Sequence, residues 1–210
     1  MMDIFDFFGS AVCHQMAERS FLIDGIQTPL CARCTTIEAG FLFGWLFLIV
    51  FRRKNGNQPF SLAGILLAAL CFVPIGIDGG GSYIGLFESS NFRRVVTGAL
   101  AGVGLPALFL LVANFQPKIQ NNMPIYRNIW EQVGLVLFTL LYGLAVYFGY
   151  LPYHLVAVVS MLGVICFYGS FWFLVLRLLT IHKKFPCFLT AFVGGFLTSG
   201  MMATLIHLVK

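Results

Sequence analysis

Apolar runs of about 20 residues recur along this 210-residue chain, and they constrain its fold more than any other feature. A run of that length spans the roughly 30 Å hydrocarbon core of a bilayer as one helix. In lipid, a spanning segment must be a helix or part of a closed barrel, because its backbone has no water to bind. The runs are continuous and do not alternate with polar residues, so they predict helices. Only 10% of the residues are charged, which excludes an ordinary soluble domain.

The predicted fold is all-α, a polytopic membrane helical bundle of about six spans. We expect the spans at residues 31–51 or 35–51, 60–77, 92–114, 130–150, 153–178 and 186–208. A short interfacial helix is expected over residues 3–21, a loop over 22–30, and a flexible break at 78–82. The acidic N-terminus is unlike a signal peptide, so we expect residues 1–210 to form one integral membrane domain as the mature protein.

Small residues four apart occur in two of the predicted spans. Gly40 and Gly44 form one pair, and Gly98 and Gly102 form the other. Such pairs allow two helices to cross closely. Glycine is also common in membrane helices for less specific reasons, and the sequence does not separate the two interpretations.

Two polar stretches interrupt the apolar pattern at the boundaries of the predicted spans. The first polar stretch comprises residues 13–34, and the second comprises residues 78–97. Polar groups at a membrane boundary are costly unless they are paired, hydrated or functional. The two stretches therefore indicate where a functional site could lie.

Lysine and arginine are distributed unevenly between the two sides that an even number of spans defines. The connections after the first, third and fifth spans carry Arg52, Arg53, Lys54, Lys118, Arg127, Arg177, Lys183 and Lys184. The other side carries Arg19, Arg33, Arg93, Arg94 and Lys210. The positive-inside rule then places the first set in the cytoplasm and both polar stretches outside. Because the basic residues are dispersed among loops, we expect no nucleic acid as a partner. Because the predicted spans cross a bilayer, we expect membrane lipid as a partner.

The cysteines of the first stretch have the spacing of a ligand set. Cys31 and Cys34 share one face if they open a helix. With Cys13 and His14 they complete a tetrahedral set for zinc or another thiophilic metal. Cys13 and His14 are adjacent, however, and on a regular helix they would point about 100° apart. A redox pair or structural disulfide is one alternative, and inert packing thiols are the other.

The second stretch could bind an anion at the start of a helix. Glu88, Asn91 and Arg94 follow helical spacing, and free N–H groups near arginines favour negative charge. We expect these residues, with Arg19 and Arg33, to bind a small anionic or lipid-like substrate. The alternative is internal pairing of the arginines with Glu18, Glu38, Asp78 and Glu88. We also predict that Arg94 lies within salt-bridge or one-water reach of Glu88 or Asp78, and close to His14, Arg19 or the turn at residues 31–34.

Several motifs follow one another in a specific order along the first half of the chain. They are Cys13-His14-Gln15, Glu18-Arg19-Ser20-Phe21, Cys31-Ala32-Arg33-Cys34-Thr35, Asp78-Gly79 and Glu88-Ser89-Ser90-Asn91 with Arg94. In this order they resemble a family of prokaryotic polytopic membrane proteins known only as a domain of unknown function. Thr36 stands where that pattern usually has Gly, and Ser82 where it often has Gln. The resemblance implies one site built from both stretches, in a prokaryotic cytoplasmic (inner) membrane, and it implies no reaction.

The leading functional hypothesis is an integral membrane protein with an outward-facing Cys/His/Arg/Glu site that depends on a metal or on thiols. A small-solute or metal transporter is one alternative, and a structural or assembly protein is another. Whether the chain is an enzyme is left open. A transporter needs polar residues through the middle of the bilayer, and the last three predicted spans contain few.

Overall fold

The computed structural model describes residues 3–209, except for 54, 59–60, 116–119 and 180–186. Within these residues the chain forms seven α-helices, one short 3-10 helix and a two-stranded antiparallel hairpin. The elements in chain order are α1 (Ile4–Ser10), η1 (Ala17–Arg19), β1 (Ser20–Ile23), β2 (Ile26–Cys31), α2 (Ala32–Val50), α3 (Leu62–Tyr83), α4 (Asn91–Asn114), α5 (Ile129–Tyr147), α6 (Tyr153–Leu179) and α7 (Cys187–Val209).

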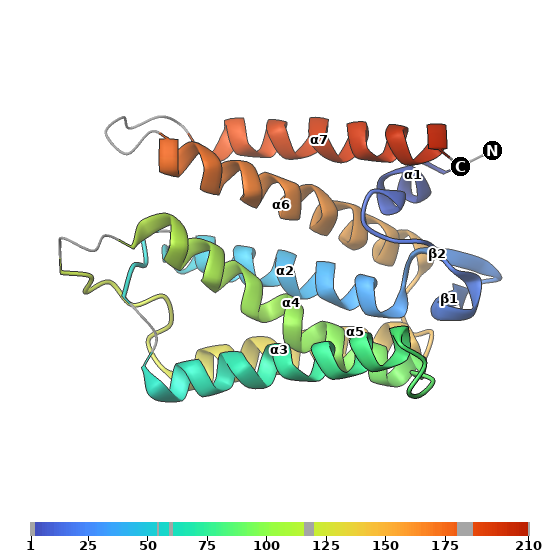
Figure 1. The fold of residues 1–210 in the computed structure, drawn as a ribbon, viewed down its shortest axis with the longest axis horizontal. Coiled ribbons are helices and arrows are strands. Elements are labelled where there is room, and N and C mark those ends of the chain that lie inside the picture. Colours follow the sequence, from blue (N-terminus) through green and yellow to red (C-terminus); the bar gives the residue numbers. More distant parts are fainter. Residues whose placement is uncertain (1–2, 54, 59–60, 116–119, 180–186, 210) are drawn as a thin grey trace.

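The long helices confirm the predicted polytopic bundle. Among the described residues, six helices, α2 to α7, are long and apolar enough to cross a membrane. They lie side by side along the long axis of the molecule, with α1 and the hairpin at the end where both termini lie (Figure 1). The most hydrophobic stretches of α4 and α2 are 61% and 50% buried, against 12% and 17% for α3 and α7. Helices α2 and α4 therefore form the centre, whereas α3 and α7 offer most of their surface to lipid.

Two glycines of α4 allow the two central helices to pack backbone against backbone. A Cβ atom on Gly102 would overlap the carbonyl of Ile37, and one on Gly98 would overlap the carbonyl of Arg33. On α2, a Cβ on Gly40 would lie 3.0 Å from the backbone nitrogen of Val103. Of the two interpretations of these glycine pairs, the structure favours close crossing, and van der Waals contact between the backbones stabilises it.

The region between α1 and α2 differs from the predicted helix over residues 3–21 and loop over 22–30. The helix ends at Ser10, and the chain then forms the hairpin of β1 and β2. Asp24 and Gly25 make its two-residue turn with φ angles of 53° and 77°. An Asp-Gly pair is a strong hairpin signal, because both turn positions need positive φ. Phe21 and Ile23 of β1 pack into an apolar cluster with residues of α5 and α6, which holds the hairpin on the bundle.

The predicted flexible break at residues 78–82 is also wrong, because α3 continues to Tyr83. Three contacts hold its last turns. Asp78 forms an ion pair with Arg33 of α2, and Ser89 donates a hydrogen bond to its carboxylate at 2.8 Å. Gly81 packs beneath the ring of Phe87. Burial and pairing of the carboxylate keep a glycine-rich sequence helical that would otherwise favour a turn.

The close crossing of α2 and α4 yields a test. The variant Gly102→Leu should lower the thermal midpoint of the detergent-solubilised protein, since the added side chain must push α2 away. Overpacking of this kind costs about 1–3 kcal/mol. Gly76→Leu is the matched control, because a Cβ at Gly76 meets nothing within 4 Å. Equal midpoints for the two variants, measured by intrinsic fluorescence, would contradict the backbone contact.

Candidate functional site

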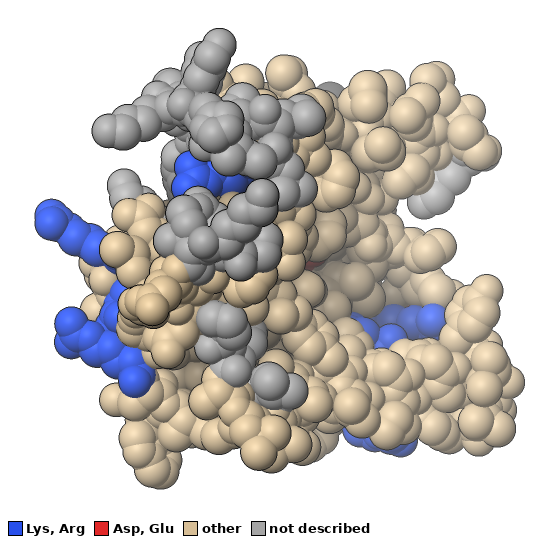
Figure 2. All heavy atoms as spheres, turned by 60° about the vertical axis from the view of Figure 1, so that its left-hand side comes forward, with Lys and Arg blue, Asp and Glu red and all other residues tan. Residues whose placement is uncertain are grey.

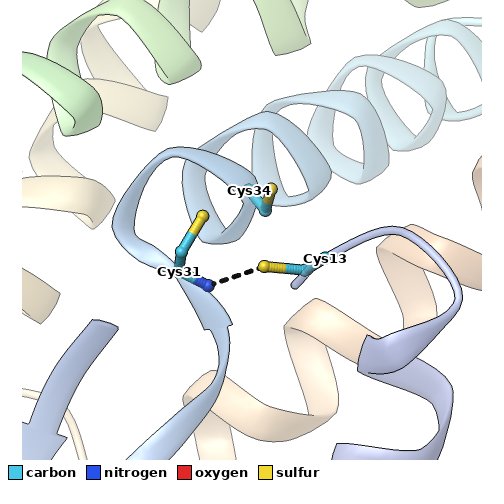
Figure 3. A group of neighbouring side chains, drawn as sticks. All are labelled: Cys13, Cys31 and Cys34. Atoms are coloured by element: carbon cyan, nitrogen blue, oxygen red, sulfur yellow. Dashed lines mark hydrogen bonds between the residues drawn. The ribbon is translucent and has the colours of Figure 1, made fainter. Parts of the chain in front are cut away.

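Three cysteines from separate parts of the first polar stretch meet at one end of the bundle. The Sγ atoms of Cys13, Cys31 and Cys34 all lie within 4.8 Å of one another (Figure 3). Cys13 lies in the loop after α1, Cys31 ends β2, and Cys34 lies in the first turn of α2. The hairpin thus returns the chain so that residues 18 positions apart share a backbone-to-sulfur hydrogen bond.

Backbone and side-chain hydrogen bonds fix the loop that carries Cys13. The sulfur of Cys13 accepts from the backbone N–H groups of Cys31 at 3.3 Å and Gln15 at 3.4 Å. Gln15 has a positive φ of 55°, and its side-chain amide donates to the carbonyls of Asp6 and Pro29. One glutamine therefore joins α1, the loop and β2. Sequence reasoning missed this role, and the only signal for it was the position of Gln15 directly after Cys13 and His14.

The pKa values of Cys13 and Cys31 are shifted in opposite directions. The pKa of Cys31 is lowered, first because the thiols of Cys13 and Cys34 donate hydrogen bonds to its sulfur. The backbone N–H groups of Cys34 and Arg33, at the start of α2, lower it further. The pKa of Cys13 is raised, chiefly because its thiol is the donor in the contact with Cys31. The group therefore loses its first proton readily, which favours both metal binding and thiol chemistry.

His14 is not part of the group of ligand atoms. Its side chain is exposed, and the group found among the described residues contains the three cysteines alone. His14 does line the same cavity as they do.

A cavity of about 190 Å³ opens beside the sulfur atoms, and we call it the sulfur cavity. It contains residues of both polar stretches, as expected for one site. Its lining is Val12, Cys13, His14, Gln15, Met16, Arg19, Cys31, Arg33, Cys34 and Arg94. Arg19, Arg33 and Arg94, which the sequence proposed for anion binding, thus lie around one space.

A second hollow of about 580 Å³ shares Arg19 and Arg94 with the sulfur cavity. Glu88 lines this hollow and is exposed, and the lining of the sulfur cavity does not include it. Asn91 accepts a hydrogen bond from Arg94 at 2.8 Å and in this way orients it. Glu38, one of the proposed partners of the arginines, is instead buried in α2 against Gly163, and its Oε2 atom has no hydrogen-bond partner.

Asp78 is the carboxylate that organises the arginines. It pairs with Arg33 and with Arg93, whose Nε lies 3.4 Å from Oδ1. Arg94 was predicted to lie within salt-bridge or one-water reach of Glu88 or Asp78. None of the ion pairs formed by the described residues includes it, but it lines the second hollow together with Glu88. Its closeness to the first stretch is as predicted.

The fold and site define a multi-pass membrane protein with a cysteine and arginine cavity at one end of the bundle. The chain belongs to the family described as "Predicted membrane protein (DUF2085)", whose model matches residues 13–108. The matched segment contains both polar stretches. The description of the family names no reaction.

Two archaeal proteins are similar in sequence to this chain. Uncharacterized protein MJ1492 of Methanocaldococcus jannaschii is 37% identical over 93 residues, which is 44% of this chain and 58% of that protein. An uncharacterized protein of Methanothermobacter thermautotrophicus is 37% identical over 97 residues, 46% of this chain and 83% of that protein. No solved structure matches the chain. The relatives therefore support the membrane family and supply no substrate.

The pairing of Asp78 yields a second test. Asp78→Ala should destabilise the protein by about 3–5 kcal/mol, because it leaves the largely buried Arg33 without its carboxylate. The control is Glu18→Ala, whose ion pair with Arg19 is exposed and 3.8 Å long. Loss of such a surface pair costs at most about 1 kcal/mol. Unfolding in mixed micelles measures both, and equal losses would show that Asp78 does not hold the end of α3.

Proposed function

We propose that this chain is a membrane protein that binds one thiophilic metal ion, such as zinc, through Cys13, Cys31 and Cys34. The observation that carries the proposal is the mutual distance of their sulfur atoms, at most 4.8 Å. Zinc–sulfur bonds of about 2.3 Å in tetrahedral geometry place the sulfurs roughly 3.8 Å apart. Small side-chain adjustments would bring the thiols into that arrangement.

Three protein ligands leave the fourth position of a tetrahedral ion free. Structural zinc sites are usually closed by four protein ligands, whereas reactive sites keep one position for water or substrate. The sulfur cavity lies beside the cysteines, and His14 lines it. The arrangement therefore supports a site that receives a ligand, and the arginines of the cavity favour an anionic or lipid-like one.

The second candidate function is thiol–disulfide chemistry at the same cysteines. The lowered pKa of Cys31 favours it, because the thiolate is the nucleophile in such reactions. The neighbouring Cys34 would then be the resolving thiol. A small-solute transporter and an assembly protein remain further alternatives, and no particular contact of the described residues favours them.

Metal and thiol analysis of the purified protein distinguishes the two candidates. With a bound metal, elemental analysis should give close to one ion per chain, and Cys13→Ser, Cys31→Ser and Cys34→Ser should each lose most of it. Cys71→Ser is the control, since Cys71 lies in α3 in a different apolar cluster. Absence of metal together with two fewer reactive thiols would instead support the redox function.

We further propose that the cysteine end of the bundle faces outward and the end with Arg52, Arg53 and Arg127 faces the cytoplasm of a prokaryotic cell. The distribution of basic residues supports this orientation. Figure 2 shows basic side chains protruding at one end and another group in a recess at the other.

Two engineered cysteines at opposite ends test the orientation. Glu88 and Arg127 are both exposed, at the cysteine end and at the opposite end respectively. In intact cells a membrane-impermeant maleimide should label Glu88→Cys above the wild-type background and should leave Arg127→Cys unlabelled until the cells are permeabilised. The reverse pattern would mean that the site faces the cytoplasm.

A further inference from the structure

Arg94 is a buried cation with few partners. It is 9% exposed, and among the described residues its guanidinium group forms one hydrogen bond, from Nη1 to Oδ1 of Asn91 at 2.8 Å. A guanidinium group has five N–H donors, and a buried charge is costly unless it is paired. Among the described residues, no carboxylate forms an ion pair with it. Arg94 therefore has unused capacity for a negatively charged partner.

The neighbouring arginines add to this excess of positive charge. Arg33 and Arg19 line the sulfur cavity with Arg94, and the lining includes no Asp or Glu. Arg33 shares Asp78 with Arg93, and its Nε is buried without a hydrogen-bond partner. The exposed pair of Arg19 with Glu18, at 3.8 Å, is a weak one.

The cysteines balance only part of this charge. Three thiolates around a divalent metal would carry one net negative charge, and three protonated thiols would carry none. Three guanidinium groups face at most that single charge, and of these only Arg33 has a buried carboxylate partner. The cavity consequently retains positive charge in either state.

We propose that the sulfur cavity binds a small oxyanion, a carboxylate or a phosphate, between Arg94 and Arg19 and beside the three sulfur atoms. Its volume of about 190 Å³ is below the roughly 300–1,000 Å³ of pockets for drug-sized ligands, so an ion or a head group fits. The adjoining hollow, which shares Arg19 and Arg94, is the route of entry. The proposal depends on the arginines alone and holds with or without a metal.

The alkylation rates of the cysteines can be used to test for the proposed anion site. Iodoacetate and iodoacetamide alkylate a thiolate in the same way: a sulfur–carbon bond forms and iodide leaves. Only iodoacetate carries a carboxylate. In the full-length protein, reduced and treated with chelator, iodoacetate should react with Cys31 or Cys34 faster relative to iodoacetamide than it does with a free thiol in solution. Mass spectrometry of the alkylated peptides measures the ratio of the two rates.

Replacement of Arg94 should remove the preference. Arg94→Gln should lower the rate ratio about tenfold, as expected for loss of a charge-assisted hydrogen bond. Arg127→Gln is the control, because it removes the same charge from an exposed position at the opposite end. Arg94→Lys, which keeps the charge without the planar fork, should retain part of the preference and tests the site if Arg94→Gln does not fold.

Competition in the wild-type protein identifies the source of the anion. Inorganic phosphate that slows iodoacetate more than iodoacetamide supports a free anion. An anionic lipid head group is supported if the iodoacetate reaction is slowed in nanodiscs that contain phosphatidylglycerol. The reaction should then not be slowed in nanodiscs of phosphatidylcholine alone, nor by inorganic phosphate. A rate ratio equal to that of a free thiol, insensitive to Arg94→Lys and to both competitors, would overturn the proposal. Because metal is absent throughout, failure of the proposed metal centre leaves each of these results unchanged.

Discussion

The ion pair between Asp78 and Arg33 is the contact on which the candidate site depends. Asp78 lies near the end of the lipid-facing helix α3, and Arg33 lies in the first turn of the central helix α2, between Cys31 and Cys34. Ser89 and Arg93 complete the surroundings of the carboxylate and so attach the start of α4 as well. At the boundary of a membrane an unpaired carboxylate or guanidinium is costly, so these segments are held together by the same electrostatic requirement. Arg94, three residues after the start of α4, lines the sulfur cavity next to these segments.

The second constraint is the path of the chain between α1 and α2. The Asp24-Gly25 turn reverses the chain, and β2 then delivers Cys31 to the start of α2 beside Cys13. The helix supplies Cys34 one turn further on, and Gln15 fixes the loop. Sulfur atoms that lie far apart in the sequence become neighbours without any disulfide among the described cysteines. Rigid backbone elements thus hold the sulfurs near one another before any ligand binds, and such preorganisation lowers the cost of binding.

Much of the fold could be predicted from the sequence, because the length and apolarity of a span are local properties. The spans follow from them, whereas the glycine pairs allowed the close approach at Gly98 and Gly102 without requiring it. The hairpin was missed, although the Asp24-Gly25 signal was present, because the polar residues around it resembled an interfacial helix. Nearness of the cysteines was predictable from their chemistry, and the adjacency of Cys13 and His14 already indicated that both side chains would not readily reach one ion. The ion pair between Arg33 and Asp78 joins residues 45 positions apart, so it depends on tertiary packing that a local sequence pattern does not predict.

The central claim is that three sulfur ligands and one open position surround a metal ion. X-ray absorption spectroscopy of the metal in the purified full-length protein tests it most directly. The account predicts about three sulfur scatterers near 2.3 Å and one lighter oxygen or nitrogen ligand. Arg94→Gln should leave the sulfur shell unchanged. A spectrum with four sulfur ligands, or with oxygen and nitrogen ligands alone, would contradict the proposed centre.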